Sequence, residues 1–449
     1  MKKTLLISVL LALPAWAQDP MSLKDAVHLA LTQNKSIGAS KAARKAAEAR
    51  VGQAQGGRLP KVNYSESWTR SDNPVFVFSS LLTQRQFGEQ NFQIQTLNRP
   101  GFLNNFQSQV TADQPLFDAG QTRHAVRAAE LSKEISGEDG RRTEMEVIAS
   151  VIRSYYETVL GAEQLEAAGQ ATRSAEADLG RAQAVRSAGM STDVDVLSIR
   201  VHLAGVRELQ IRRAAALDVA RATLNDVLGL PLDTAHTLTT PLAPLPPGSE
   251  AVTGYETSAL EQRPEARQAK WATRLAENRV ATARGNLLPQ IGVHAAFEAD
   301  RQNFYDRGGA NWLVSVGMRW NLFNGFSDKA HIAETQFELA RSRAQQESAT
   351  SAIRLQVRRQ YADLLAAQQR IEVARASIAE AEESLRITQN RYQAGFGNVT
   401  DLLRTETALL EARTRSLSAI HDQRIAAAML GLAAGTLGAD SEVLNEGSR

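Results

Sequence analysis

Three titratable side chains flank two short turns in the sequence. Asp195 follows the first turn, and Tyr392 and Asp401 lie on either side of the second. Each aspartate stands three residues after a capping residue, Thr192 or Asn398, a pattern that can satisfy the free amides at the start of a helix. The chemistry indicated is hydrogen bonding and charge placement, and helix capping alone would account for both aspartates.

The rest of the chain offers no catalytic or metal-binding pattern. Its seven histidines are scattered, it has no cysteine, and it lacks the GxSxG, GK[ST] and GxGxxG motifs. We therefore expect no enzymatic activity, no cofactor and no metal site. The 51 basic and 49 acidic residues nearly balance, so charge gives no reason to expect nucleic-acid binding.

Very long helices are predicted to hold the two turns. Helices are expected over about 121–187 and 327–393, and at about 1.5 Å per residue each would be roughly 100 Å long. Apolar residues recur every seventh position in the second of them: Val357, Leu364, Ile371, Ile378, Leu385 and Tyr392. A sustained heptad pattern predicts helix-on-helix, coiled-coil packing.

The two halves of the chain repeat one layout. Residues 31–62 match 260–291 at an offset of 229, and residues 179–207 match 385–413 at an offset of 206. Each half therefore reads as a shorter helix, two strands, a long helix, a turn and a returning helix. The shorter and returning helices of the first half are expected over about 30–58 and 191–228, and 23 extra residues lie between Pro60 and Leu116.

This layout predicts the following organisation. We expect a signal peptide over 1–17, followed by a first repeat over 18–229 with strands in 60–117 and a tip turn at 187–193. A proline-rich linker over 230–254 leads to a second repeat over 255–435, with strands in 289–323 and a tip turn at 393–399. The chain ends in a tail over 436–449.

The strand segments alternate between apolar and polar residues. Ile291, Val293, Ala295 and Phe297 share one face, and the partner strand places Trp312, Val314, Val316, Met318, Trp320 and Leu322 on one face. Outward apolar residues with tryptophans near both ends favour a transmembrane barrel. In the first half Glu66 interrupts the apolar face. The alternative is a half-buried antiparallel sheet in a soluble protein.

The start of the chain predicts export. Two lysines, a short apolar run and Ala15-Trp16-Ala17 are typical of a cleaved signal peptide. No apolar run reaches the roughly 20 residues of a spanning helix, so membrane insertion would require strands. Four strands cannot close a barrel, and open edges do not survive in lipid. We therefore expect several copies to pool their strands.

The chain resembles the TolC-type outer-membrane efflux proteins. The resemblance rests on the N-terminal run 21–34, its second copy at 259–265, the Leu-Pro pair before each strand pair, the exits at 116–120 and 322–325, and the two Ala-Gly turns. It covers nearly the whole mature chain, and its strength lies in the order, spacing and duplication of these pieces.

The resemblance implies an α+β membrane protein of the bacterial outer membrane. Long coiled-coil helices would form a helical barrel in the periplasm, and four transmembrane strands per chain would give a 12-stranded barrel in a homotrimer. The partners implied are the lipid bilayer, a periplasmic adaptor (membrane fusion) protein and an inner-membrane pump. The function implied is that of a passive channel in tripartite efflux or type I secretion.

The resemblance also implies roles for the turns. Residues at the positions of Asp195, Tyr392 and Asp401 would form a periplasmic gate. The tips that dock the adaptor would be Arg186, Ser187, Ala188, Gly189 and Met190 in the first turn, and Arg391, Ala394, Gly395 and Phe396 in the second.

Two residues depart from the family pattern. Gly397 stands where a gate arginine would be and Arg404 where a second aspartate would be, so the bonding network of the gate should differ. Tyr392 also completes the heptad pattern, so a packing role alone is an alternative. The rival class of protein is a secreted coiled-coil structural or surface protein with no transport role. The 23 extra residues are expected to form a loop, interrupted by Pro74 and Pro100, that caps the outer mouth.

Overall fold

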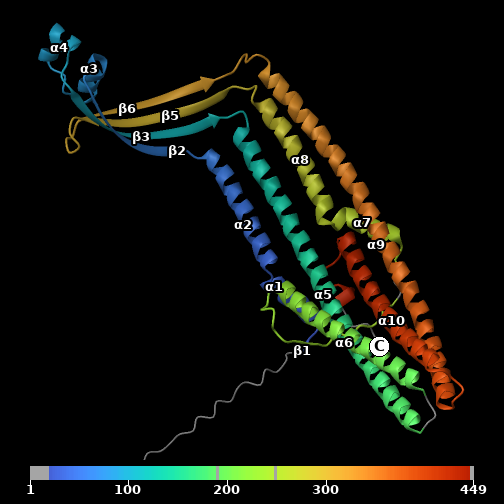
Figure 1. The fold of residues 1–449 in the computed structure, drawn as a ribbon. Helices are drawn as coiled ribbons and strands as arrows, with labels where there is room; N and C mark the ends of the chain where they lie inside the picture. Colours follow the sequence, from blue (N-terminus) through green and yellow to red (C-terminus); the bar gives the residue numbers. More distant parts are fainter. Residues whose placement is uncertain (1–19, 189–191, 247–249, 445–449) are drawn as a thin grey trace, which may run out of the picture. The chain divides into compact units, whose positions relative to one another are not determined.

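The computed structural model describes residues 20–188, 192–246 and 250–444 (Figure 1). The expected signal peptide at 1–17, together with Gly189 and Met190, lies outside the described residues. The chain divides into two compact units. One takes in the chain up to Ala42, Glu138–Arg267 and the chain from Ser348, and the other comprises Ala43–Gly137 and Gln268–Glu347.

The helices repeat in the two halves. The first half contains α1 (Leu23–Gln33), α2 (Lys35–Gln55), α5 (Gln121–Ser187) and α6 (Asp193–Leu228), and the second contains α7 (Val252–Gln262), α8 (Pro264–Gly285), α9 (Ser327–Gln393) and α10 (Val399–Ala434). Short 3-10 turns occupy Gly56–Arg58, Glu89–Phe92 and Glu442–Leu444. The long helices α5 and α9 have 67 residues each, which confirms the predicted bounds. None of the described helices is long and apolar enough to cross a membrane.

The single helix predicted over 30–58 is wrong, because the chain breaks at Asn34 between α1 and α2. Asn34 has ψ 130°, and Arg263 has the same value at the equivalent break between α7 and α8. The C-terminal glycine of a returning helix lies against each break. A Cβ on Gly229 would lie 2.7 Å from the carbonyl oxygen of Gln33, and one on Gly435 would lie 2.7 Å from the nitrogen of Arg263. Both glycines have positive φ, which other residues adopt at a cost.

The largest apolar core anchors the proline-rich linker. Leu23 of α1 and Ile152 of α5 are fully buried in it. The hydroxyl of Tyr155 donates to the carbonyl of Met21 at 3.0 Å and accepts from the amide of Thr240 at 2.9 Å. Next to this bridge, β1 (Pro20–Met21) pairs in parallel with β4 (Thr237–Leu238). The linker expected over 230–254 is therefore bound to the helices along part of its length, and α7 begins before it ends.

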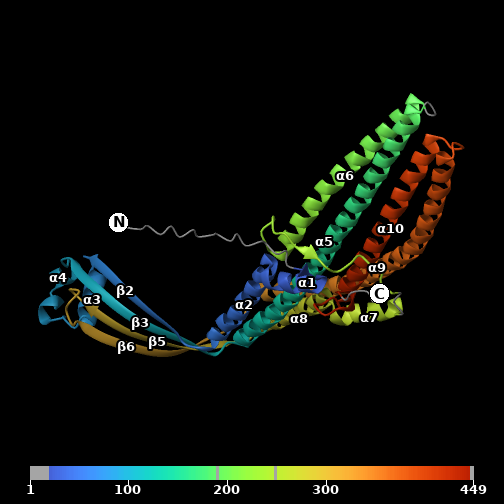
Figure 2. The same cartoon turned by 90° about the horizontal axis from the view of Figure 1, so that it is seen from below.

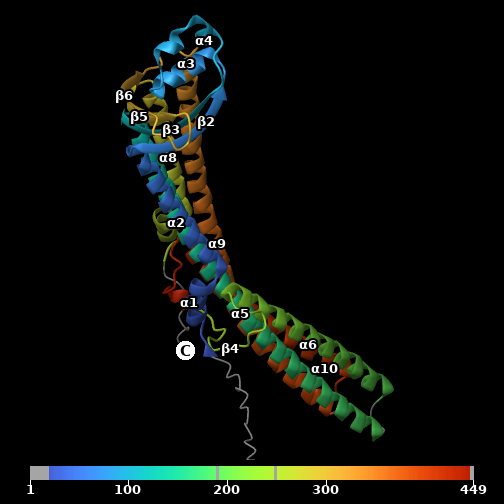
Figure 3. The same ribbon diagram turned by 90° about the vertical axis from the view of Figure 1, so that its left-hand side faces the viewer.

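The four-stranded sheet is antiparallel, in the order β2 (Lys61–Ser71), β3 (Leu103–Phe117), β5 (Gln290–Arg301) and β6 (Gly309–Arg319). The strands lie side by side in one curved sheet (Figures 2 and 3). The central β3–β5 pair joins the two halves of the duplicated chain, and β2 and β6 are the edges. Because β6 ends at Arg319, Trp320 and Leu322 lie beyond the strand on which they were expected.

The strand register gives the sheet one apolar and one polar face. Tyr64, Val110, Phe297 and Trp312 are aligned across the four strands, and Val62, Ala112, Ala295 and Val314 form the next row on that face. On the other face a row reads Ser65, Gln109, Glu298 and Asn311. Trp312 is 79% exposed and Val316 is 69% exposed, so the apolar face is uncovered in the single chain.

Glu66, which interrupts the apolar face, is paired within the sheet. Arg301 lies 2.9 Å from its carboxylate, and the hydroxyls of Tyr64 and Ser108 also donate to it. Arg301 in turn donates to the hydroxyl of Ser108 at 2.7 Å. The charge therefore has a partner on its own face, which an isolated carboxylate in an apolar setting would require.

The segment expected to be a capping loop is largely helical. It forms α3 (Pro74–Thr83) and α4 (Ile94–Asn98). Asn73 caps α3, accepting from the amides of Val75 and Phe76, and proline suits the first helical position because its nitrogen needs no partner. Figures 1 and 2 show α3 and α4 at the end of the sheet away from α2 and α8.

Candidate functional site: the helix tips

Two helical hairpins carry the predicted site. One consists of α5 and α6 and the other of α9 and α10 (Figure 2). The second turn begins with Gly395 at φ 77°. The amide of Gly395 donates to the carbonyl of Tyr392 at 3.1 Å, and the amide of Phe396 donates to that of Arg391 at 2.9 Å. These two bonds terminate α9 in a Schellman motif and leave Phe396 80% exposed.

Asp195 caps α6. The hydroxyl of Thr192 donates to its carboxylate at 3.0 Å, the Thr192 amide donates to the same oxygen at 3.2 Å, and the Asp195 amide donates back to the Thr192 hydroxyl oxygen at 3.3 Å. This is the reciprocal capping box expected from the sequence. The capping role of Asp195 is confirmed.

Tyr392 lies in a small apolar cluster where the ends of four helices meet. It packs against buried Ala182 of α5, Val196 and Ile199 of α6, and Val399 of α10. Burial raises the pKa of Tyr392, and the nearby charges of Asp195 and Asp178 add to that rise. The structure thus brings Tyr392 and Asp195 together, as two of the three predicted gate residues.

Asp401 has different surroundings. Asn398 caps α10 by accepting from the Asp401 amide at 2.7 Å. The carboxylate of Asp401 is half exposed and lies 3.8 Å from the guanidinium of Arg404. Arg404, one of the two departures from the family pattern, therefore pairs with Asp401 one turn along the same helix.

Gly397, the other departure, stands where a side chain would be crowded. A Cβ there would lie 3.0 Å from the backbone nitrogen of Tyr392 and 3.2 Å from its Cα. Contacts that short are tighter than ordinary van der Waals packing allows, so an arginine at this position would require the turn to shift.

The predicted docking tips are exposed where they are described. Arg186 pairs with Asp193 across the first turn at 2.5 Å, and the hydroxyl of Ser187 donates to the carbonyl of Ala184 at 2.7 Å. Ala188, Arg391, Ala394 and Gly395 are exposed as well. Gly189 and Met190 lie outside the described residues.

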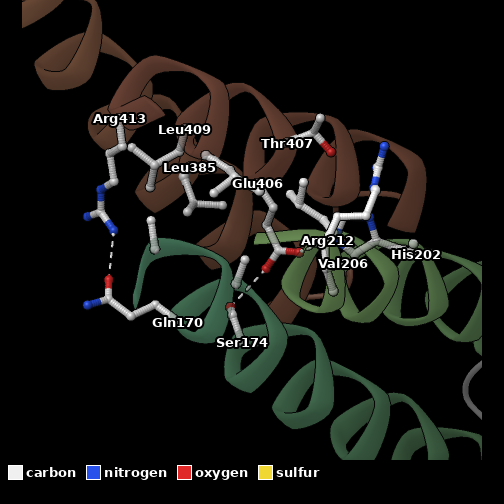
Figure 4. A pocket seen from close by; sticks show the side chains of 15 residues that line it. Gln170, Ser174, His202, Val206, Arg212, Leu385, Glu406, Thr407, Leu409 and Arg413 are labelled. Atoms are coloured by element: carbon white, nitrogen blue, oxygen red, sulfur yellow. Dashed lines mark hydrogen bonds and ion pairs between the residues drawn. The ribbon is translucent and has the colours of Figure 1, made fainter. Parts of the chain in front are cut away.

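A buried polar cluster next to the tips was missed in the sequence analysis. Asp178 of α5 is 1% exposed, and the side chain of Glu406 of α10 is 9% exposed. The hydroxyl of Ser174 donates to Glu406 at 3.1 Å, and His202 Nε2 lies 3.5 Å from the other Glu406 oxygen (Figure 4). A signal was present, because Glu406 stands between Leu402 and Leu409 on the apolar stripe of α10.

The described part of the chain holds no group of three or more histidine, aspartate or glutamate side chains placed to bind a metal ion. The site can therefore offer hydrogen bonds, charges and an apolar contact between helix ends.

Comparison with known proteins places this arrangement in context. The family model described as "Outer membrane efflux protein" matches residues 26–230 and 257–436. The chain is 27% identical to protein CyaE of Bordetella pertussis, over 95% of this chain and 86% of that one. It is 24% identical to the proteases secretion protein PrtF of Dickeya chrysanthemi, over 92% and 87%.

A solved structure shares the fold. The outer membrane channel CmeC of Campylobacter jejuni superposes with a TM-score of 0.79 at 15% identity, covering 96% of this chain and 92% of that one. At this low sequence identity, the similarity shows only that the two proteins share a fold.

Proposed function

Because this chain belongs to the outer membrane efflux protein family, we propose that three copies form a passive duct across the outer membrane, through which cargo leaves the cell. The duct is the outer part of a tripartite efflux or type I secretion system. It takes cargo from an inner-membrane pump through a periplasmic adaptor. The chain itself catalyses no reaction.

The uncovered apolar face of the sheet is the observation that carries this proposal. Its rows of Tyr64, Val110, Phe297 and Trp312 suit contact with lipid, and the polar rows opposite suit a water-filled interior. The edges β2 and β6 need partners, because unpaired backbone groups are costly in lipid. Strands from neighbouring copies would pair with them, and three copies would supply 12 strands.

The helices suit the periplasmic part of the duct. Each copy would contribute its two hairpins to a helical barrel, with the tips facing the adaptor. The docking surface would consist of Arg186, Ser187, Ala188, Gly189 and Met190 in the first turn, and of Arg391, Ala394, Gly395 and Phe396 in the second. Phe396 is the largest apolar group among those that are described there.

The gate would lie at the same end. Asp195 and Tyr392 would hold the helix ends of one copy together, and three copies of Asp401 would line the aperture. A ring of carboxylates attracts cations. The pairing of Asp401 with Arg404 would weaken this field.

The first prediction tests the oligomer. Native mass spectrometry of the detergent-solubilised protein should give three copies, since a four-stranded sheet with two open edges cannot close in lipid by itself. A protein released without detergent would favour the secreted structural protein. A stable membrane-embedded monomer would contradict the duct.

The second prediction concerns α3, α4 and the turn between them, which would lie at the outer mouth. Because the chain has no cysteine, Gln86→Cys gives a single labelling site at an exposed residue. A membrane-impermeant maleimide should label it on intact cells. Two control variants, Gln84→Cys at a residue only 2% exposed and Ser187→Cys at a tip, should stay unlabelled.

Opening the outer membrane should then expose Ser187→Cys to the reagent and leave Gln84→Cys protected. The side chain of Gln84 donates to the carbonyl of Asn104 and to Asn105, which accounts for its protection. Labelling of Gln86→Cys only after permeabilisation would place this segment in the periplasm.

A further inference from the structure

The buried polar cluster connects the two hairpins. Asp178 and Ser174 belong to α5, His202 to α6 and Glu406 to α10. Ser174 and His202 of the first hairpin both approach Glu406 of the second, at 3.1 and 3.5 Å. Ser174, His202 and Glu406 border a cavity of about 510 Å³ that is also lined by Leu385 of α9 (Figure 4). The two hairpins thus share a buried polar contact at this level.

The burial of both carboxyl groups and the unpaired oxygen of Asp178 favour a proton shared between them. Arg181 pairs with one oxygen of Asp178. The other oxygen is buried and meets no N–H or hydroxyl donor among the described residues. Two ionised carboxylates would repel each other at this site, whereas a proton on Asp178 can be donated to Glu406.

We propose that Asp178, Glu406 and His202 form a proton-dependent latch that holds the α5–α6 hairpin against the α9–α10 hairpin of the same copy. With one shared proton, Asp178 donates to Glu406, which also accepts from Ser174 and His202. Loss of that proton leaves two negative charges in a mostly buried site and weakens the contact between the hairpins. The consequence for conduction rests on the duct proposed above, in which the hairpin ends border the aperture.

The electrostatics set the pH range. Burial, and then the hydrogen bond with Glu406, raise the pKa of Asp178 from 3.8 to about 6, although Arg181 opposes the rise. Burial alone would raise the pKa of Glu406, but hydrogen bonds from His202, Asp178 and Ser174 outweigh it and lower that pKa. Below about pH 6, and above the lowered pKa of Glu406, the pair therefore holds a single proton.

The direction of the effect follows from linkage. When the hairpins separate, Asp178 returns to its ordinary pKa. A group whose pKa is raised in the closed form stabilises that form fully below the ordinary value, and this contribution is lost as the pH rises through the raised one. Glu406 acts in the opposite sense, losing its contribution only as the pH falls through its lowered pKa. Hence the latch is weaker at pH 7 than in mild acid.

Further titratable groups lie near the pair on all four helices. They are Arg181 on α5, Arg212 on α6, Tyr392 on α9 and Arg413 on α10. Arg413 donates to Gln170 of the first hairpin at 3.4 Å and is paired with Glu382 at 2.8 Å, so a second contact between the hairpins is independent of the proton.

Hydrogen–deuterium exchange of the intact trimer in detergent tests the latch without any need for conduction. Asp178→Asn mimics the protonated side chain at every pH. In the segments 172–182 and 402–410, the wild-type protein should exchange within about threefold of the variant at pH 4 and on the order of a hundredfold faster at pH 7, as a shift from 3.8 to about 6 requires. Equal rates for the two proteins at pH 7 would overturn the latch.

Two further variants sharpen the result. Glu406→Gln removes the other carboxylate and should reduce the pH dependence as well. Glu176→Gln removes an exposed carboxylate of α5 that pairs with Arg207 within the first hairpin, and it should follow the wild-type profile. A flat profile for Glu176→Gln would assign the effect to general charge and not to the latch.

Planar-bilayer conductance separates this inference from the proposed duct. Wild-type conductance should rise between pH 4 and pH 7, and that of Asp178→Asn should stay low. If exchange follows the prediction but conductance does not change with pH, the latch stands and its link to the aperture fails.

Discussion

Val316→Arg is expected to prevent assembly of the protein in the outer membrane. Val316 lies in the middle of β6, opposite Val293, on the apolar face of the sheet. An arginine facing lipid near the bilayer midplane costs about 2–4 kcal/mol, and a trimer would carry this cost three times. The summed cost would offset most of a folding stability of about 5–15 kcal/mol. The amount of heat-resistant trimer in outer-membrane fractions measures the loss.

The neighbouring residue provides a matched control. Ser315 lies on the opposite face of the same strand, aligned with His294, which in turn is aligned with Asp113. Ser315→Arg adds the same side chain in a row that already holds a 2.7 Å contact between His294 and Asp113. It should assemble nearly as well as the wild-type protein. Equal assembly of both variants would show that the apolar face does not meet lipid.

Tyr392→Ala is expected to open the proposed periplasmic gate. Partial burial of an aromatic side chain stabilises by roughly 1–1.5 kcal/mol, so its loss shifts the balance toward the open form about tenfold per copy. In the proposed trimer three copies would act on one aperture, and their effects should add. Planar-bilayer recording should show higher conductance and a larger open fraction.

Conservative variants separate packing from charge at the gate. Tyr392→Phe keeps the ring against Val196 and Val399 and should stay close to the wild type if packing dominates. Asp195→Asn preserves much of the cap but removes the charge beside Tyr392. Asp401→Asn should change ion selectivity and leave the open fraction nearly unaltered. A lower melting temperature without any change in conductance for Tyr392→Ala would leave Tyr392 as a packing residue only.

Features with a strict local period could be predicted from the sequence. The bounds of α5 and α9 follow from the turn residues at their ends and from the duplication, with a heptad pattern from Val357 to Tyr392 in α9. The two faces of the sheet follow from alternation along β5 and β6. The duplication also indicated which segments of the two halves are structurally equivalent. Such features depend on residues close together in the chain, where the spacing of apolar side chains decides which face is buried.

The helix break at Asn34 could partly have been predicted from the sequence. Its equivalent, Arg263, precedes Pro264, and a residue before proline is disfavoured in a helix. Duplication would have carried that break to the first half. The reason for the break, the packing of Gly229 and Gly435 against it, involves residues about 200 positions away and required the fold.

Only the tertiary structure decided the roles of the acidic residues near the tips. Asp195 and Asp401 stand at equivalent positions, yet one completes a capping box beside Tyr392 while the other is half exposed and close to Arg404. The burial of Asp178 was not visible from the sequence either, since acidic residues on helices are mostly solvated; for Glu406 the only signal was its place on the apolar stripe of α10. Whether a carboxylate is buried, paired or protonated depends on which helices pack against it, and that is fixed by contacts between distant parts of the chain.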